Sequence, residues 1–210
     1  MRLTMIIMVL FMLLIPLTAA AADTPRIDGI YETVPAHPFE FDGKTVEIVE
    51  FLSFYCGHCY HFEKEIPVIR GNFPGKITWR IVPIYWGSAS PKPGEAYFLA
   101  EEAGKGEQMK RALFHTLFAD NRDISTIEVL EDLGMKTGLG FDFSKKLRAG
   151  DKARNVGEAI LLSRSYDINE TPTLIIAGNL KVSAGMVQGD INRFRDNVIT
   201  ILNSLLRKGQ

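Results

Sequence analysis

The sequence predicts an α/β fold in which a block of helices interrupts a small sheet. Strand-like runs occur in two groups, at residues 45–54 and 76–84 and again at residues 172–182, with helical periodicity beside each group. Between residues 87 and 150 the strand-like runs disappear and only helical periodicity remains. A length of 210 residues with 46% hydrophobic side chains suits one domain that carries an inserted subdomain.

The N-terminus has the pattern of a secretory signal peptide. Arg2 supplies a positive charge, an apolar run of thirteen residues extends from Met5 to Leu17, and small residues fill positions 19–22. We expect cleavage after Ala22, which would make residues 1–22 the signal peptide and leave 210 − 22 = 188 residues. An uncleaved membrane anchor is the alternative, although its apolar run falls short of the roughly 20 residues that span a bilayer.

Charge and hydropathy argue against nucleic acid as a partner. The formal net charge is −1, or −2 once Arg2 is removed, and no basic patch or charge run is present. No second apolar span follows the first, so we expect the mature chain to be soluble.

The first group of strand-like runs predicts a βαβ unit. Alternation in residues 45–54 puts Glu50 on one face of the strand among apolar side chains, namely Val46, Ile48, Leu52 and Phe54. Glu50 is therefore predicted to be a buried acid, with a half-exposed surface acid as the alternative. The helix that follows ends near Asn72, and Pro67 is expected to kink it. A second strand at residues 76–84 would lie parallel to the first.

The middle block is expected to contain four helices, at residues 95–103, 107–119, 126–133 and 141–148. In the second of these, an apolar stripe is expected to pack in the core: Met109, Leu113, Leu117 and Phe118.

The remainder of the chain returns to a mixed pattern. A helix is expected at residues 153–166, with Val156, Ile160 and Leu161 facing inward. Two strands follow it and are joined by a hairpin turn at Gly178-Asn179. The last element is an amphipathic helix over residues 191–205. Residues 23–86 and 151–210 would thus form one domain around a helical insertion at residues 87–150.

The candidate active site is the segment around Cys56 and Cys59, the only cysteines in the chain. Two cysteines separated by two residues, at the junction of a strand and a helix, are typical of a redox dithiol. Free N–H groups and the positive end of the helix dipole favour a thiolate at the start of a helix. Cys56 is therefore expected to be the attacking sulfur and Cys59 the resolving one.

Three other interpretations of the pair are weaker. A structural disulfide would close a very short loop and would constrain the unfolded chain little. A zinc site could use His58 and His61, but no second Cys/His cluster supplies the rest of a tetrahedron, so we expect no metal. Covalent haem attachment requires His directly after the second Cys, and Tyr60 stands there.

The run from Glu50 to Glu63 resembles the active-site segment of the DsbA family of periplasmic thiol:disulfide oxidoreductases. The resemblance implies a thioredoxin fold with an inserted helical subdomain, which agrees with the order of the expected elements. It implies a monomeric periplasmic enzyme without a cofactor that donates its Cys56–Cys59 disulfide to unfolded or folding secreted polypeptides with free thiols. It also implies re-oxidation by a membrane quinone-linked partner of the DsbB type.

The resemblance assigns roles to further residues. Glu50 would accept or relay a proton during exchange. Thr171 and Pro172 would stand in the place of the cis-proline that packs against the two cysteines, and the backbone of Thr171 would pair with an extended client segment. His58, between the cysteines, is expected to favour the thiolate of Cys56.

Two departures from the DsbA pattern point towards disulfide isomerases. Gly57 stands where DsbA enzymes usually carry Pro, and Thr171 before the proline is similar to DsbC and DsbG. Those isomerases need an N-terminal dimerisation domain, however, and the roughly twenty mature residues before Thr45 are too few for one. The alternatives are a periplasmic reductase or isomerase with the same active site, or a non-catalytic binding or chaperone module with a structural bridge.

Overall fold

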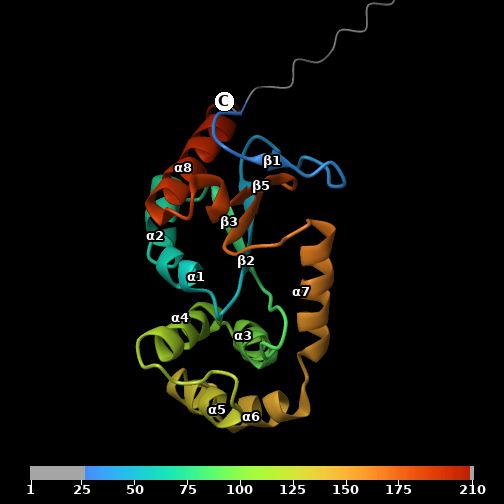
Figure 1. Ribbon diagram of the computed structural model, residues 1–210, viewed down its shortest axis with the longest axis vertical. Coiled ribbons are helices and arrows are strands. Elements are labelled where there is room, and N and C mark those ends of the chain that lie inside the picture. The colour runs from blue at the N-terminus through green and yellow to red at the C-terminus, as the bar shows by residue number, and fades with distance from the viewer. Residues whose placement is uncertain (1–26, 209–210) are drawn as a thin grey trace, which may run out of the picture.

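A five-stranded sheet forms the centre of the protein, which we describe from a computed structural model over residues 27–208 (Figure 1). The strands lie in the order β1-β5-β4-β2-β3. Their bounds are Glu32–Thr33 for β1, Val46–Leu52 for β2, Ile77–Pro83 for β3, Thr173–Ile176 for β4 and Leu180–Ser183 for β5. The expected signal peptide lies outside the described residues. No helix between residues 27 and 208 has the length and apolar character that crossing a membrane requires.

The pairing of the strands confirms both predicted units. β2 and β3 run parallel, with Val46 opposite Ile77 and Leu52 opposite Pro83, as expected for a βαβ unit. β4 and β5 are antiparallel and form the predicted hairpin. Its turn requires Gly178, which has a φ of +82° and would bring any Cβ within 2.5 Å of the Pro38 carbonyl oxygen.

Eight α-helices and one short 3-10 helix occur in residues 27–208. The helices before the insertion and within it are α1 Gly57–Phe62, α2 Ile66–Asn72, α3 Lys92–Glu102, α4 Gly106–Phe118, α5 Ile127–Lys136 and α6 Gly140–Ala149. The later ones are α7 Ala153–Ser165, the 3-10 helix Ala184–Val187 and α8 Ile191–Lys208. All four helices expected in the middle block are present, within about three residues of their predicted bounds. The division of the chain at residues 86 and 150 stays a prediction.

The helix after the two cysteines differs from its prediction. One kinked helix was expected, but the chain forms two separate helices, α1 and α2. Pro67 lies in the first turn of α2, where its missing N–H leaves no hydrogen bond unmade. The proline therefore marks the start of a new helix and not a bend within an old one.

Helices cover both faces of the sheet, as strand alternation requires. Val46 and Ile48 of β2 pack in a cluster with residues of α1, α2 and α8. Val49 and Phe51, on the opposite face, pack with Ala159 of α7. Figure 1 shows the same arrangement, with α1, α2 and α8 on one side of the strands and α7 on the other.

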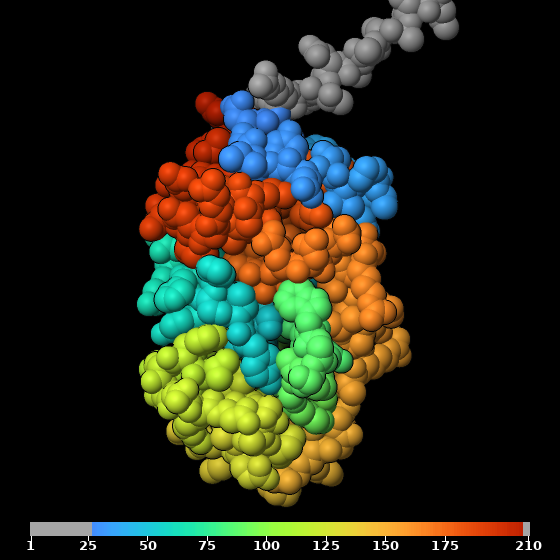
Figure 2. Space-filling model, viewed as in Figure 1, coloured from blue at the N-terminus to red at the C-terminus, as the bar shows by residue number. Residues whose placement is uncertain are grey.

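The insertion, α3 to α6, covers the end of the sheet at which β2 finishes. Leu52, Phe54 and Cys59 pack there with the buried side chains of these helices. In Figure 2 the insertion lies against the segment that carries the cysteines. Two expected core residues are more exposed than predicted: Phe118, at 37%, and Leu161, at 64%. Leu161 lies on the face of α7 opposite the buried Val156, Ala159 and Ser163. Phe118 is the last residue of α4, and one side of its ring stacks on Tyr60.

Candidate active site

Cys56 and Cys59 lie where β2 leads into α1, both as free thiols. Cys56 is the N-cap of α1, and its Sγ accepts a hydrogen bond from the backbone N–H of Cys59 at 3.4 Å. Cys56 is partly exposed, whereas Cys59 is only 1% exposed and packs in the core of the insertion. Gly57 occupies the first helical position, which also suits proline, so this departure from the DsbA pattern leaves the local geometry intact.

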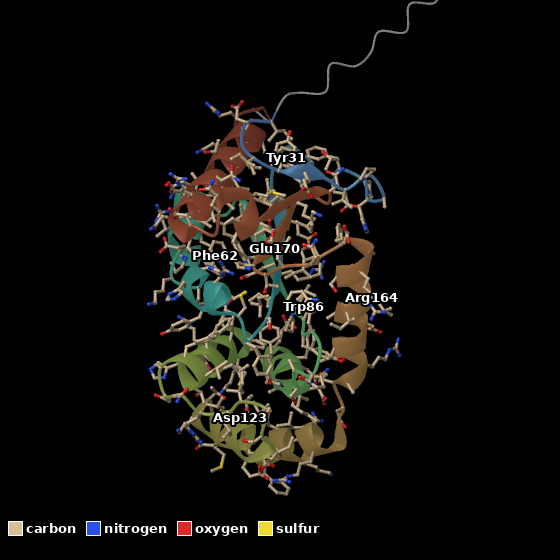
Figure 3. The ribbon with its side chains drawn as sticks, viewed as in Figure 1. Tyr31, Phe62, Trp86, Asp123, Arg164 and Glu170 are labelled. Atoms are coloured by element: carbon tan, nitrogen blue, oxygen red, sulfur yellow. The ribbon has the colours of Figure 1, made fainter. Side chains whose placement is uncertain are left out.

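The loop before β4 contacts the first cysteine. The peptide bond between Thr171 and Pro172 is cis, as the resemblance implied. Cys56 Sγ lies 3.2 Å from the Thr171 carbonyl oxygen, to which it donates when it is protonated, across 115 positions of sequence. In Figure 3, Phe62 at the end of α1 and Glu170 just before Thr171 mark the two segments that meet here. The fold thus brings together the dithiol and the residues expected to bind an extended client.

The pKa values of the two thiols are moved in opposite directions. Hydrogen bonding from the Cys59 side chain is the largest influence on Cys56, followed by burial, which opposes it. The Thr171 side chain and the backbone N–H groups of Cys59 and His58 assist, and the pKa of Cys56 falls to about 5. Burial, with the hydrogen bond and charge of Cys56, raises the pKa of Cys59 well above its usual range. Near neutral pH, Cys56 is therefore a thiolate and Cys59 a thiol.

The His58 side chain is exposed. A side chain at Gly189 would lie 3.5 Å from its Nε2, so the ring lies beside the loop before α8. The backbone N–H of His58, at the start of α1, lowers the pKa of Cys56. In residues 27–208, no three His, Cys, Asp or Glu side chains are grouped so that they could hold a metal ion.

Glu50 is buried within β2, the strand that leads to the dithiol, as its place in the strand predicted. It is 1% exposed, and one carboxylate oxygen accepts a hydrogen bond from Trp79 Nε1 at 2.8 Å. Burial raises the pKa of Glu50 to about 7, although the positive charge of Lys110 and the Trp79 hydrogen bond oppose this rise. A carboxyl group with this pKa can both take up and release a proton at neutral pH.

Sequence reasoning missed the charged neighbours of Glu50. Lys110 of α4 is completely buried and pairs with Glu63 Oε2 at 2.8 Å, and Glu63 directly follows α1. A signal was present: Lys110 is next to Met109 and three positions before Leu113, so helical spacing puts it on the apolar face of α4.

A family model described as Thioredoxin matches residues 44–186. The thiol:disulfide interchange protein DsbA of Azotobacter vinelandii is 26% identical over 169 residues, which cover 80% of this chain and 78% of the relative. The protein of the same name from Pseudomonas aeruginosa is 24% identical over 155 residues, 72% of each chain.

Solved structures agree on the fold. The crystal structure of Pseudomonas aeruginosa DsbA has a TM-score of 0.70 at 20% identity, covering 86% of this chain and 92% of its own. Reduced DsbA1 from Neisseria meningitidis has a TM-score of 0.64 at 20% identity, covering 89% and 98%. The chain therefore belongs to the thioredoxin family and is a thiol:disulfide oxidoreductase of the DsbA type.

Proposed function

We propose that this oxidoreductase is exported and donates a disulfide between Cys56 and Cys59 to folding secreted polypeptides. A client thiolate attacks Cys56 Sγ, the bond between the two cysteines breaks, and Cys59 leaves and takes up a proton. A second client thiolate then attacks the client sulfur of the mixed disulfide and releases Cys56 as a thiolate. The client loses two electrons, and the enzyme gains them as its dithiol.

The observation that carries this proposal is the place of Cys56 at the N-cap of α1, where its Sγ accepts the Cys59 N–H, beside a buried Cys59. This arrangement lowers the pKa of Cys56 to about 5 and raises that of Cys59. A leaving thiolate of low pKa departs readily and stabilises the reduced enzyme, which makes the disulfide oxidising. This favours an oxidase over a reductase or isomerase with the same residues. A structural bridge in a non-catalytic module would have no need of an activated sulfur.

The other site residues have supporting roles in the proposal. Glu50 supplies and accepts the proton of Cys59. The backbone of Thr171, beside Cys56, pairs with an extended client segment, and Pro172 shapes that surface. His58 favours the Cys56 thiolate, chiefly through its backbone N–H.

We further propose a setting for this activity. Residues 1–22 direct export to the periplasm, where the protein acts as a monomer on unfolded or folding polypeptides with free thiols. A membrane quinone-linked enzyme of the DsbB type restores the disulfide. The DsbA names of the relatives support this setting.

The test is the reduction potential, measured by equilibrating the protein with glutathione buffers and separating the redox forms by a thiol-trapping mass shift. We expect a bridge that is reduced more readily than glutathione disulfide and that oxidises a reduced, unfolded model protein in stoichiometric amounts. Replacing Cys56 by Ser should abolish the transfer. A bridge as hard to reduce as a structural disulfide would contradict the proposal.

Client binding has a separate test. Pro172→Ala should slow the release of clients, so mixed disulfides through Cys56 should accumulate when the variant is expressed with its signal peptide. They should be absent from Pro172→Ala combined with Cys56→Ser. If no mixed disulfides accumulate in the single variant, the assignment of Pro172 to the client-binding surface is wrong.

A further inference from the structure

Lys110 is a lysine with no exposed side-chain surface, in the second helix of the insertion. Its Nζ lies 2.8 Å from Glu63 Oε2 and 3.1 Å from Glu107 Oε2. Fully buried lysines are rare, because removing an ammonium group from water is unfavourable unless carboxylates compensate for it. An apolar residue on this face of α4 would extend the core without that penalty, so the charge itself calls for an explanation.

The surroundings of Lys110 connect it to the active site. On the face of β2 that carries Glu50, Ile48 packs with α1, α2 and α8, and Leu52 packs with the insertion. Glu50 therefore lies at the boundary between the sheet core and the insertion. The partner of Lys110, Glu63, donates its backbone N–H to the Cys59 carbonyl oxygen at 3.0 Å. Lys110 is thus joined through Glu63 to the end of the helix that carries Cys59, and its charge acts on Glu50.

The charges that face this site come from four elements. Glu50 lies on β2, Glu63 follows α1, and Glu107 with Arg111 lies on α4. Arg70 of α2 lies 3.6 Å from Glu107, near the surface. The pKa of Tyr97, on α3, is raised mainly by burial and also by the charges of Glu107 and Glu50. Among the charges, Lys110 has the largest influence on the pKa of Glu50, which it lowers, whereas Glu63 and Glu107 raise it less. Lys110 is thus the buried cation that favours the ionised form of Glu50.

We propose that Lys110 is a positioning residue for disulfide exchange, through which the helical insertion enables Glu50 to exchange a proton with Cys59 near neutral pH. This inference rests on the proposed function. When Cys59 resolves a mixed disulfide, its proton passes to the Glu50 carboxylate, and its thiolate attacks Cys56 Sγ. The bond between the two cysteines forms, and the other partner leaves Cys56 as a thiolate. In the reverse direction Glu50 returns the proton to Cys59.

The experiment isolates this resolving step. Reduced protein is mixed with glutathione disulfide from pH 5 to 9 and quenched in acid, and the Cys56–glutathione mixed disulfide and the internal disulfide are separated by mass. The variants are Lys110→Met, which removes the charge, and Lys110→Arg, which keeps it. Lys136→Met is the matched control, because Lys136 also belongs to an ion pair of the insertion, with Asp132 at 3.0 Å, but is exposed.

Lys110→Met should move the pH midpoint of resolution upward, because Glu50 then ionises only at higher pH. Below the midpoint, each unit of this shift should slow resolution about tenfold. The rate of the first step, attack by Cys56, should change less. Lys110→Arg keeps the charge, so its midpoint should lie close to that of the wild type. The midpoint of Lys136→Met should equal that of the wild type.

A second variant protects the test against misfolding. Lys110→Met combined with Glu63→Gln removes both members of the buried pair, so no uncompensated charge remains between them. Its midpoint should still lie above that of the wild type, because Lys110 influences Glu50 more strongly than Glu63 does.

Variants that lose stability but keep the wild-type midpoint would overturn the inference and leave Lys110 a structural residue. The same shift in Lys136→Met would also overturn the inference, because the midpoint would then depend on the net charge of the protein and not on Lys110. If wild-type Cys56 did not react with glutathione disulfide at all, the proposed function would fail, and this inference with it.

Discussion

Cys56 and Cys59 are three positions apart, yet their surroundings move their pKa values in opposite directions. The difference arises from exposure and from hydrogen-bond direction. Cys56 lies at the start of a helix and receives N–H groups, whereas Cys59 is enclosed by apolar side chains of the insertion. One CxxC motif can therefore supply both an activated thiolate and a protected thiol.

His58→Leu tests how much of this activation comes from a side chain. The His58 ring is exposed, so water screens any charge that it carries, and the substitution keeps the backbone N–H. We expect the pKa of Cys56 to rise by less than about one unit and the potential to change by less than about 30 mV. Thiolate absorbance against pH gives the first quantity, and glutathione equilibrium gives the second. A larger rise would make the ring, and not the start of the helix, the main source of activation.

Glu50→Gln tests the energetic consequence of the buried acid. The pKa of Glu50 is raised from 4.5 to about 7 in the folded protein. Such a group contributes stability below its unfolded pKa and loses it as the pH rises through the folded pKa. The variant should therefore match the wild type below pH 4.5 and exceed it above pH 7, by on the order of 3 kcal/mol.

Urea denaturation across this pH range measures the effect. Glu47→Gln on the exposed side of the same strand is the matched control, and its stability should follow the wild type. A Glu50→Gln variant that is less stable than the wild type at pH 8 would contradict this expectation. It would show that the interactions of the carboxylate with Lys110 and Trp79 outweigh the desolvation penalty of its burial.

At the scale of elements, two helical glycines make a matched pair. Gly134 lies within α5, and a Cβ there would come within 2.3 Å of the Phe143 ring of α6. Gly157 lies within α7 and would meet nothing within 4 Å. Alanine favours a helix over glycine by about 1 kcal/mol at either position. Any difference in stability between the two alanine variants should therefore come from the steric clash at Gly134.

We expect Gly157→Ala to stabilise the protein by about 0.5–1 kcal/mol. Gly134→Ala should destabilise it by about 1–3 kcal/mol through overpacking. Adding Phe143→Leu to Gly134→Ala should recover part of the loss, as measured by thermal or urea unfolding. Equal effects at both sites would mean that α5 and α6 are packed less tightly than described.

The sequence was informative where a signal is local. Alternation in residues 45–54 predicted both the strand and the buried Glu50, and the turn residues at Gly178-Asn179 predicted the hairpin. Pro67 was misleading, because a proline within helical periodicity fits a kink and a new first turn equally well. Lys110 escaped because its partner Glu63 is 47 positions away, and only the packed fold decides whether a lysine is buried.

The whole molecule links its redox state to its stability. The reduced form carries the Cys56 thiolate, whose pKa is about 5 in the fold against an ordinary 9.0, and the oxidised form lacks this group. A depressed pKa contributes stability that is present in full above the unfolded pKa and is lost as the pH falls through the folded one. The reduced form should therefore gain stability over the oxidised form as the pH rises from about 5 to 8. Near pH 9 Cys59 opposes this gain, because its raised pKa lets it ionise only in the unfolded chain.

The difference in unfolding free energy between the two forms is the quantity to measure, by urea denaturation with and without reductant at several pH values. Glu50 titrates in the same range but is present in both forms, so the difference removes most of its contribution. The entropic effect of the bridge on the unfolded chain is also independent of pH. The slope should approach but not exceed about 1.4 kcal/mol per pH unit, since one proton is involved and Cys56 is partly exposed.

Cys56→Ser provides the control for this slope, because it leaves Glu50 and the insertion in place and removes only the titrating thiol. Between pH 5 and 8, the pH dependence of its stability should match that of the oxidised wild type, although the absolute values differ because the variant has no bridge. A difference between reduced and oxidised protein that is flat over this range would mean that the folded protein does not stabilise the Cys56 thiolate. The oxidising power would then have to come from strain in the oxidised form, which the pH dependence separates from thiolate stabilisation because strain does not titrate.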